Sequence, residues 1–211
     1  SGLIIAKGKV QAFIATLVTM TALRGVTMVY TEGRPISTGF SDGADHFAWL
    51  GTGYLLGLPV PIWLMAIVFL LAWYLLNHTR LGRYIYALGG NESATRLSGI
   101  NVDRVKLAVY GLCGMLSALA GLIVTSRLSS AQPTAGMGYE LDAIAACVVG
   151  GVSFAGGVGT VAGVITGVLI FTLINYGLTY IGVSPYWQFI IKGGIIILAV
   201  ALDSMKYAKK K

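Results

Sequence analysis

Residues 77–106 read NHTRLGRYIYALGGNESATRLSGINVDRVK, the one long polar passage that membrane-grade apolar sequence bounds on both sides. Within it, Asn91 opens the run NESATRLSG, which closes at Gly99. Asn91 can cap the free N–H groups of a helix start, Glu92 suits the positive end of the helix dipole, and Gly99 can adopt the left-handed conformation that ends a helix. The pattern predicts a short capped helix outside the bilayer. That helix is either a solvated connector between two spans or a docking helix for another protein.

The composition of the 211-residue chain indicates an integral membrane protein. The chain is 56% hydrophobic and 11% charged, with a mean hydropathy of +0.79, whereas soluble domains carry about 25% charged residues. Several apolar runs approach the roughly 20 residues that cross a hydrocarbon core as a helix, and they lack the alternation of an outer-membrane barrel. Because lipid offers the backbone no hydrogen-bond partners, we expect an all-α, polytopic bundle of transmembrane helices.

The order of the apolar runs predicts about six crossings. The expected spans are residues 12–30, 59–76, 105–125, 141–152, 159–180 and 185–202. The 141–152 run is too short to cross with ease, so a re-entrant segment is the alternative there.

Charge asymmetry predicts the orientation of these spans. The 77–106 stretch carries five basic residues, whereas the 31–58 loop carries Arg34 alone. By the positive-inside rule, residues 77–106 are expected in the cytoplasm and the 31–58 loop outside. The basic tail is also expected inside, which requires an odd number of crossings after residue 130 and puts the glycine-rich turn 153–158 at the cytoplasmic side. The tail lysines are Lys206, Lys209, Lys210 and Lys211.

Glycines at four-residue spacing predict one closely packed helix face. Gly159, Gly163 and Gly167 would share that face, where the absence of side chains lets another helix approach. Ordinary packing within the chain is the simpler interpretation of this pattern.

Polar side chains at membrane depth are candidates for a pathway or for internal pairing. Lys192 lies within the last span, and Glu140 and Asp142 begin the short one, so an ion pair between Lys192 and one carboxylate is one hypothesis. Snorkelling of Lys192 to the outer surface is the other. Gln132 and Asn175 could line a hydrophilic pathway, or each could make a helix-to-helix hydrogen bond.

The sequence contains few residue patterns that indicate an enzyme. No GxxxxGK[ST] loop is present to bind nucleotide phosphates, so we do not expect this chain to hydrolyse ATP itself. Cys113 and Cys147 lie within apolar runs, far from any metal-ligand spacing. We therefore expect no catalytic residue, no metal and no cofactor bound by this chain.

Two stretches carry a resemblance to a known family. Residues 79–106, TRLGRYIYALGGNESATRLSGINVDRVK, and residues 126–157, SRLSSAQPTAGMGYELDAIAACVVGGVSFAGG, resemble the permease subunits of bacterial ATP-binding-cassette importers for monosaccharides. The resemblance covers essentially the whole chain. Because members of that family are longer at the N-terminus, it implies that residues 1–211 are the C-terminal two-thirds of one transmembrane permease domain, with its coupling loop at about 77–106.

The resemblance also implies a function and partners. It implies a multi-pass protein of the bacterial inner membrane that moves ribose or a related monosaccharide into the cytoplasm, driven by ATP and Mg on a separate subunit. The implied partners are a cytoplasmic ATP-binding-cassette ATPase, a periplasmic sugar-binding protein and a second permease copy. The family's ATPase-coupling residues fall on Gly89, Gly90, Asn91, Glu92, Ala94, Arg96, Leu97, Gly99 and Ile100.

A stand-alone sugar channel or secondary carrier is the alternative function. The sequence has no chain of intramembrane carboxylates of the kind that couples transport to protons or sodium, which counts against a carrier.

Overall fold

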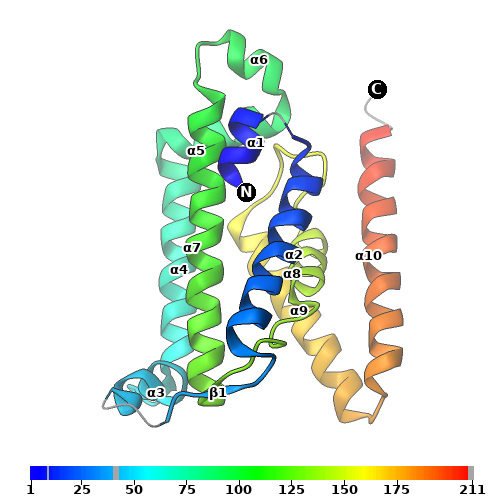
Figure 1. The fold of residues 1–211 in the computed structure, drawn as a ribbon. Helices are drawn as coiled ribbons and strands as arrows, with labels where there is room; N and C mark the ends of the chain where they lie inside the picture. Colours follow the sequence, from blue (N-terminus) through cyan, green and yellow to red (C-terminus); the bar gives the residue numbers. More distant parts are fainter. Residues whose placement is uncertain (9, 40–42, 209–211) are drawn as a thin grey trace. The chain divides into compact units, whose positions relative to one another are not determined.

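The computed structural model describes residues 1–8, 10–39 and 43–208, and these residues are mostly helical, as predicted (Figure 1). Lys9, Asp42 and the tail Lys209–Lys211 lie outside the described residues, and so does the side chain of Lys206. The expected cytoplasmic position of the tail therefore stays a prediction.

Four helices in the described part of the chain are long and apolar enough to cross a membrane. They are α2 (Ala12–Thr31), α4 (Val60–His78), α7 (Val102–Leu128) and α9 (Val161–Tyr180). Each matches one of the predicted spans closely, because each span is a continuous apolar run with a local start and stop signal.

The other two predicted crossings are less regular. Helix α8 (Tyr139–Val149) has 11 residues, which at about 1.5 Å per residue is roughly half of the ~30 Å hydrocarbon core. Helix α10 (Pro185–Ala208) is apolar over Pro185–Leu198. Six crossings therefore stay a prediction.

The described chain forms two compact units, which we describe separately. Unit 1 is Ser1–Leu81 with Arg96–Ala135, and unit 2 is Gly82–Thr95 with Gly136–Lys211. The single permease domain expected from the resemblance stays a prediction.

Unit 1 is built on α7. Helix α1 (Gly2–Gly8) packs against α7 and buries Ile5 and Ala6. At the other end of α7, helix α3 (Ala44–Thr52) packs so closely that the fully buried Ser126 hydroxyl donates a hydrogen bond to the carbonyl oxygen of Phe47. Helix α3 lies within residues 31–58, where the sequence predicted a loop.

Short strands tie two loops of unit 1 together. Strand β1 (Ile36–Ser37) pairs antiparallel with β4 (Ser130–Ala131), and β2 (Tyr54–Leu55) pairs with β3 (Leu58–Pro59) in a hairpin. The first pair joins the 31–58 loop to the loop after α7, and the sequence predicts both loops outside the membrane. Their pairing is consistent with that prediction.

Unit 2 is centred on the packing of α8 against α9. Ala145, Ala146 and Phe171 form its buried cluster, with Val168 and Ile196 against it. The unit also contains residues 82–90 of helix α5 (Arg80–Gly90), the first turn of α6 (Glu92–Leu97), and α10, which packs on α8.

Two of the three predicted glycines lie at the α8–α9 contact. A Cβ built on Gly167 would meet the carbonyl oxygen of Ala146 and lie 2.6 Å from the N atom of Gly150. A Cβ built on Gly163 would meet the carbonyl oxygen of Gly150. These glycines let the two helix backbones touch, as their spacing predicted.

The prediction was wrong for Gly159, which precedes the helix. Helix α9 begins at Val161 because the side chain of Thr160 caps it, accepting a hydrogen bond of 3.0 Å from the N–H of Gly163. Gly159 lies in the turn before that cap, where its Cβ position is 3.2 Å from Cγ2 of Val152.

We predict that Gly167→Ala lowers the free energy of unfolding by about 1–3 kcal/mol, because the added methyl group overpacks the α8–α9 contact. Gly177→Ala in the same helix is the control, since a Cβ there meets no atom of another described element within 4 Å, and it should leave stability unchanged or raise it by up to ~1 kcal/mol. Thermal unfolding of the detergent-purified protein measures both. Equal effects at the two positions would contradict a backbone contact at Gly167.

Candidate functional site

The capped helix predicted at residues 92–98 is present as α6 (Glu92–Leu97). The N–H of Ala94 donates to Oδ1 of Asn91 at 2.9 Å, which is the expected cap. Gly99 has a φ of 80° and its N–H donates to the carbonyl oxygen of Arg96 at 3.1 Å, which closes the helix. The local start and stop signals are therefore confirmed.

Most residues of α6 are exposed to solvent. Thr95 is the buried residue of this helix, and its hydroxyl donates to the carbonyl oxygen of Asn91 at 2.8 Å. Leu97, in contrast, is 89% exposed. Leu97 is thus a large apolar side chain exposed within a polar stretch of the chain.

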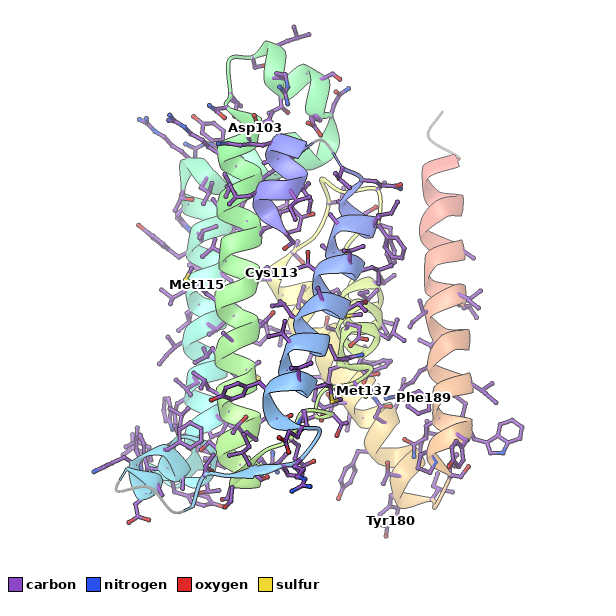
Figure 2. The ribbon with its side chains drawn as sticks, viewed as in Figure 1. Asp103, Cys113, Met115, Met137, Tyr180 and Phe189 are labelled. Atoms are coloured by element: carbon purple, nitrogen blue, oxygen red, sulfur yellow. The ribbon has the colours of Figure 1, made fainter. Side chains whose placement is uncertain are left out.

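The charged groups of α6 are also exposed. Arg96 lies 3.6 Å from Oδ1 of Asp103, which is labelled in Figure 2 in the first turn of α7. Both side chains are about half exposed, so this pair contributes little to stability. Of the remaining predicted coupling residues, Gly89 and Ile100 are partly buried, whereas Gly90 and Glu92 are exposed.

Sequence analysis missed the helix that precedes α6. Residues 80–90 form α5, whose covered face includes Gly82, Ile85 and Gly89 while Arg83 and Tyr84 are exposed. This spacing of three to four residues is the ordinary sign of an amphipathic helix. The same spacing is visible in the sequence and could have predicted this helix.

The covered face of α5 meets the glycine-rich turn within unit 2. A Cβ on Gly89 would meet the N atom of Gly157, and a Cβ on Gly157 would lie 2.8 Å from the N atom of Gly90. One turn earlier, the Tyr86 hydroxyl donates to the carbonyl oxygen of Gly159 at 2.8 Å. The turn that the sequence predicted on the same side as residues 77–106 thus lies directly against residues 86–90 of that stretch.

An ion pair between Lys192 and Asp142 joins α10 to α8 in unit 2. Nζ of Lys192 lies 2.9 Å from Oδ1 and 3.0 Å from Oδ2 of Asp142, with side-chain exposures of 20% and 28%. The same ammonium lies 5.9 Å from the ring centre of Phe189, labelled on α10 in Figure 2. Lys192 therefore pairs with Asp142 and not with Glu140, which is exposed at the start of α8.

The other two polar candidates lie on other elements of the chain. In α9, Oδ1 of Asn175 is buried and makes no hydrogen bond within the described residues. Gln132 is exposed in the loop after β4 and belongs to unit 1. A pathway role for Gln132, Glu140, Asp142, Asn175 or Lys192 stays a prediction.

The described residues offer no metal-binding cluster. Among them, no group of three or more His, Cys, Asp and Glu side chains could hold a metal ion. The candidate site consists of the exposed residues of α6.

Comparison with known proteins supports a transport role. Residues 1–200 match the family described as branched-chain amino acid transport system / permease component. The chain is 64% identical over 206 residues to the ribose import permease protein RbsC of Escherichia coli K12, covering 98% of this chain and 64% of that relative. It is 65% identical over 210 residues to RbsC of Haemophilus influenzae, covering 100% of this chain and 65% of that relative.

A permease protein named for galactose import is also similar to this chain. The galactose/methyl galactoside import permease protein MglC of E. coli K12 is 54% identical over 217 residues, covering 100% of this chain and 64% of that relative. The chain thus spans about two-thirds of the length of these relatives. No solved structure matches the chain.

We predict that Lys192→Met lowers the free energy of unfolding by about 1–3 kcal/mol, because it leaves the half-buried carboxylate of Asp142 unpaired. The double variant Lys192→Met with Asp142→Asn should lose less than the sum of the two single variants. Thermal unfolding in detergent measures this double-mutant cycle.

Glu140→Gln is the control, since Glu140 is exposed two residues away on the same helix. It should change stability by less than about 0.5 kcal/mol. Additive effects of the Lys192 and Asp142 substitutions would show that the lysine does not depend on this carboxylate.

Proposed function

Because this chain belongs to the family of permease components of branched-chain amino acid transport systems, we propose that it is a permease subunit of an ATP-binding-cassette importer. Its proposed cargo is ribose or a related monosaccharide, moved into the cytoplasm across the bacterial inner membrane. The observation that carries the proposal is the 64–65% identity to two ribose import permease proteins along nearly the whole chain.

The proposed energy source is a separate subunit. A cytoplasmic ATPase would bind ATP and Mg, and this chain would contribute no nucleotide site. A periplasmic sugar-binding protein would deliver the sugar, and two permease copies would enclose the pathway. Affinity for the sugar can then reside in the binding protein, so the permease needs no strong binding site of its own.

Helix α6 is the proposed contact with the ATPase. Its hydrogen-bonded cap at Asn91 and its left-handed end at Gly99 make it a short rigid body, and the exposed Leu97 offers an apolar anchor. Closure of the ATPase around ATP would displace such a helix without bending it. A flexible loop would absorb the same displacement.

We propose that residues 77–106 and the 153–158 turn both face the cytoplasm. The contact of Gly89 with Gly157 supports one common side for these segments. The β1–β4 pair supports a common side for the 31–58 and 127–138 loops, which we assign to the outside. This arrangement needs α8, despite its 11 residues, to carry the chain from one side to the other.

Galactose is the second candidate sugar. The 54% identity to MglC of E. coli covers the whole chain, so the two sugar classes share much of this scaffold. Competition between ribose and galactose for uptake separates the two candidates.

We predict ATP-dependent uptake of radiolabelled ribose when the full-length protein, its ATPase and its binding protein are reconstituted in liposomes. Omitting the ATPase should abolish uptake, and excess ribose should compete more strongly than excess galactose. Uptake that continues without the ATPase would identify a channel or a secondary carrier instead.

A variant of α6 tests the proposed contact with the ATPase. Leu97→Ser should lower the affinity of the ATPase for the permease about tenfold or more, as the loss of an apolar anchor usually does. Leu56→Ser is the control, because Leu56 is 86% exposed in the β2–β3 turn, which we assign to the opposite side. Co-purification of the ATPase measures both variants.

We also predict the sidedness of single cysteines in a variant without Cys113 and Cys147. Ala155→Cys and Ser93→Cys, both exposed, should react with an impermeant maleimide only in inside-out vesicles. Leu56→Cys should react only in right-side-out vesicles. Labelling of Ala155→Cys from the outside would show that α8 is re-entrant and would reject the six-crossing arrangement.

A further inference from the structure

The transport role leaves one feature of unit 2 unexplained: α5 and the 153–159 turn meet backbone to backbone. Three glycines make this contact. A Cβ on Gly89 would meet the N atom of Gly157, and a Cβ on Gly156 would lie 2.7 Å from the carbonyl oxygen of Gly89. Gly156 and Gly157 also have φ values of 88° and 72°, which side chains rarely adopt. At Gly156 and Gly157 a side chain is therefore excluded both by the backbone of α5 and by the positive φ.

Tyr86 adds a side-chain hydrogen bond between these segments. Its hydroxyl donates to the carbonyl oxygen of Gly159 at 2.8 Å, across 73 residues of chain. Tyr86 is partly buried, so the bond is shielded from competing water. Gly159 immediately precedes Thr160, the cap of α9. The tyrosine therefore holds the position at which α9 begins.

The turn that Tyr86 and Gly89 contact is itself closed by hydrogen bonds. The N–H of Ser153 donates to the carbonyl oxygen of Val158 at 3.0 Å, and the N–H of Gly156 donates back to the carbonyl oxygen of Ser153 at 3.2 Å. The N–H of Ala155 donates to Oγ of Ser153 at 3.1 Å. A turn closed in this way moves as one body.

The contact between α5 and the 153–159 turn leads to α6 on one side and to α8 and α9 on the other. Toward α6, the N–H of Asn91 donates to the carbonyl oxygen of Ala87 and the N–H of Thr95 donates to that of Asn91, each at 3.0 Å, so hydrogen bonds bridge α5 and α6. Toward the membrane, Gly163 and Gly167 hold α9 against α8. A displacement of α6 has a path of direct contacts to both helices.

We propose that Tyr86 and the interlocked Gly89, Gly156 and Gly157 form the mechanical link that carries displacement of α6 to α8 and α9. In this link Tyr86 is a positioning residue, because it acts through the start of α9 and touches neither sugar nor nucleotide. The inference rests on the proposed function, since it assigns α6 a moving partner. A backbone interlock suits the task because it has no side-chain rotamers that could yield.

The test is Tyr86→Phe in the full-length protein, reconstituted with its ATPase and binding protein. The measured quantity is ribose transported per ATP hydrolysed. Loss of the hydroxyl should lower this ratio about fivefold, the factor that corresponds to one typical hydrogen bond. The ATPase should still co-purify with the variant, because Tyr86 lies on the covered face of α5.

Tyr84→Phe is the matched control, since it removes the same hydroxyl from an exposed position on the same helix. It should leave the ratio unchanged. Gly89→Ala is a second variant of the link, and it should also lower the ratio because its methyl group would separate α5 from the turn.

The possible results distinguish failure of the proposed mechanical link from failure of the proposed transport function. An unchanged ratio in Tyr86→Phe overturns the link, even if total uptake falls with the amount of folded protein, because a merely structural role reduces transport and ATP hydrolysis together. Absence of ATP-dependent ribose uptake in the unsubstituted protein rejects the proposed function itself.

Discussion

Direct contact between backbones at glycine is the interaction on which unit 2 depends. It occurs twice, between α5 and the 153–159 turn and between α8 and α9, and in both places a Cβ would overlap backbone atoms. In lipid, apolar side chains gain little by leaving one apolar environment for another, so helix association relies on close van der Waals contact and hydrogen bonds. Glycine permits the closest contact. Both contacts use glycines between residues 150 and 167, namely Gly156 and Gly157 in the turn and Gly163 and Gly167 in α9.

An ion pair adds to these glycine contacts where α10 packs against α8. Helix α10 lies against α8 through Ile196 at the apolar cluster and through Lys192 at the carboxylate of Asp142. An ion pair of this kind seldom adds much stability over apolar packing, but it fixes which helix faces meet. Oδ1 of Asn175 is the exception, since it is buried on α9 without a hydrogen bond within the described residues.

The sequence predicted what local signals encode. Four spans and the capped helix follow from apolar runs, from Asn91 and from Gly99, and the structure reproduces them within a few residues. Helix α3 and the β1–β4 pair were missed because their stabilising contacts, such as Ser126 with Phe47, join distant residues. The assignment of Gly159 to a helix failed because four-residue spacing also occurs across a helix start. The cap at Thr160, bonded to Gly163, was the local signal that could have corrected it.

The placement of α5 changes the meaning of the coupling stretch. A short helix between two flexible loops could rotate freely, and its contact with an ATPase would then transmit little. Here hydrogen bonds at Asn91 join α6 to α5, and Tyr86 and Gly89 join α5 to the turn before α9. In the proposed link, α5 is fixed to the turn by direct backbone contact at Gly89 and Gly157. Because this contact contains no compressible side chains, the proposed displacement of α5 has to move the turn or break the contact.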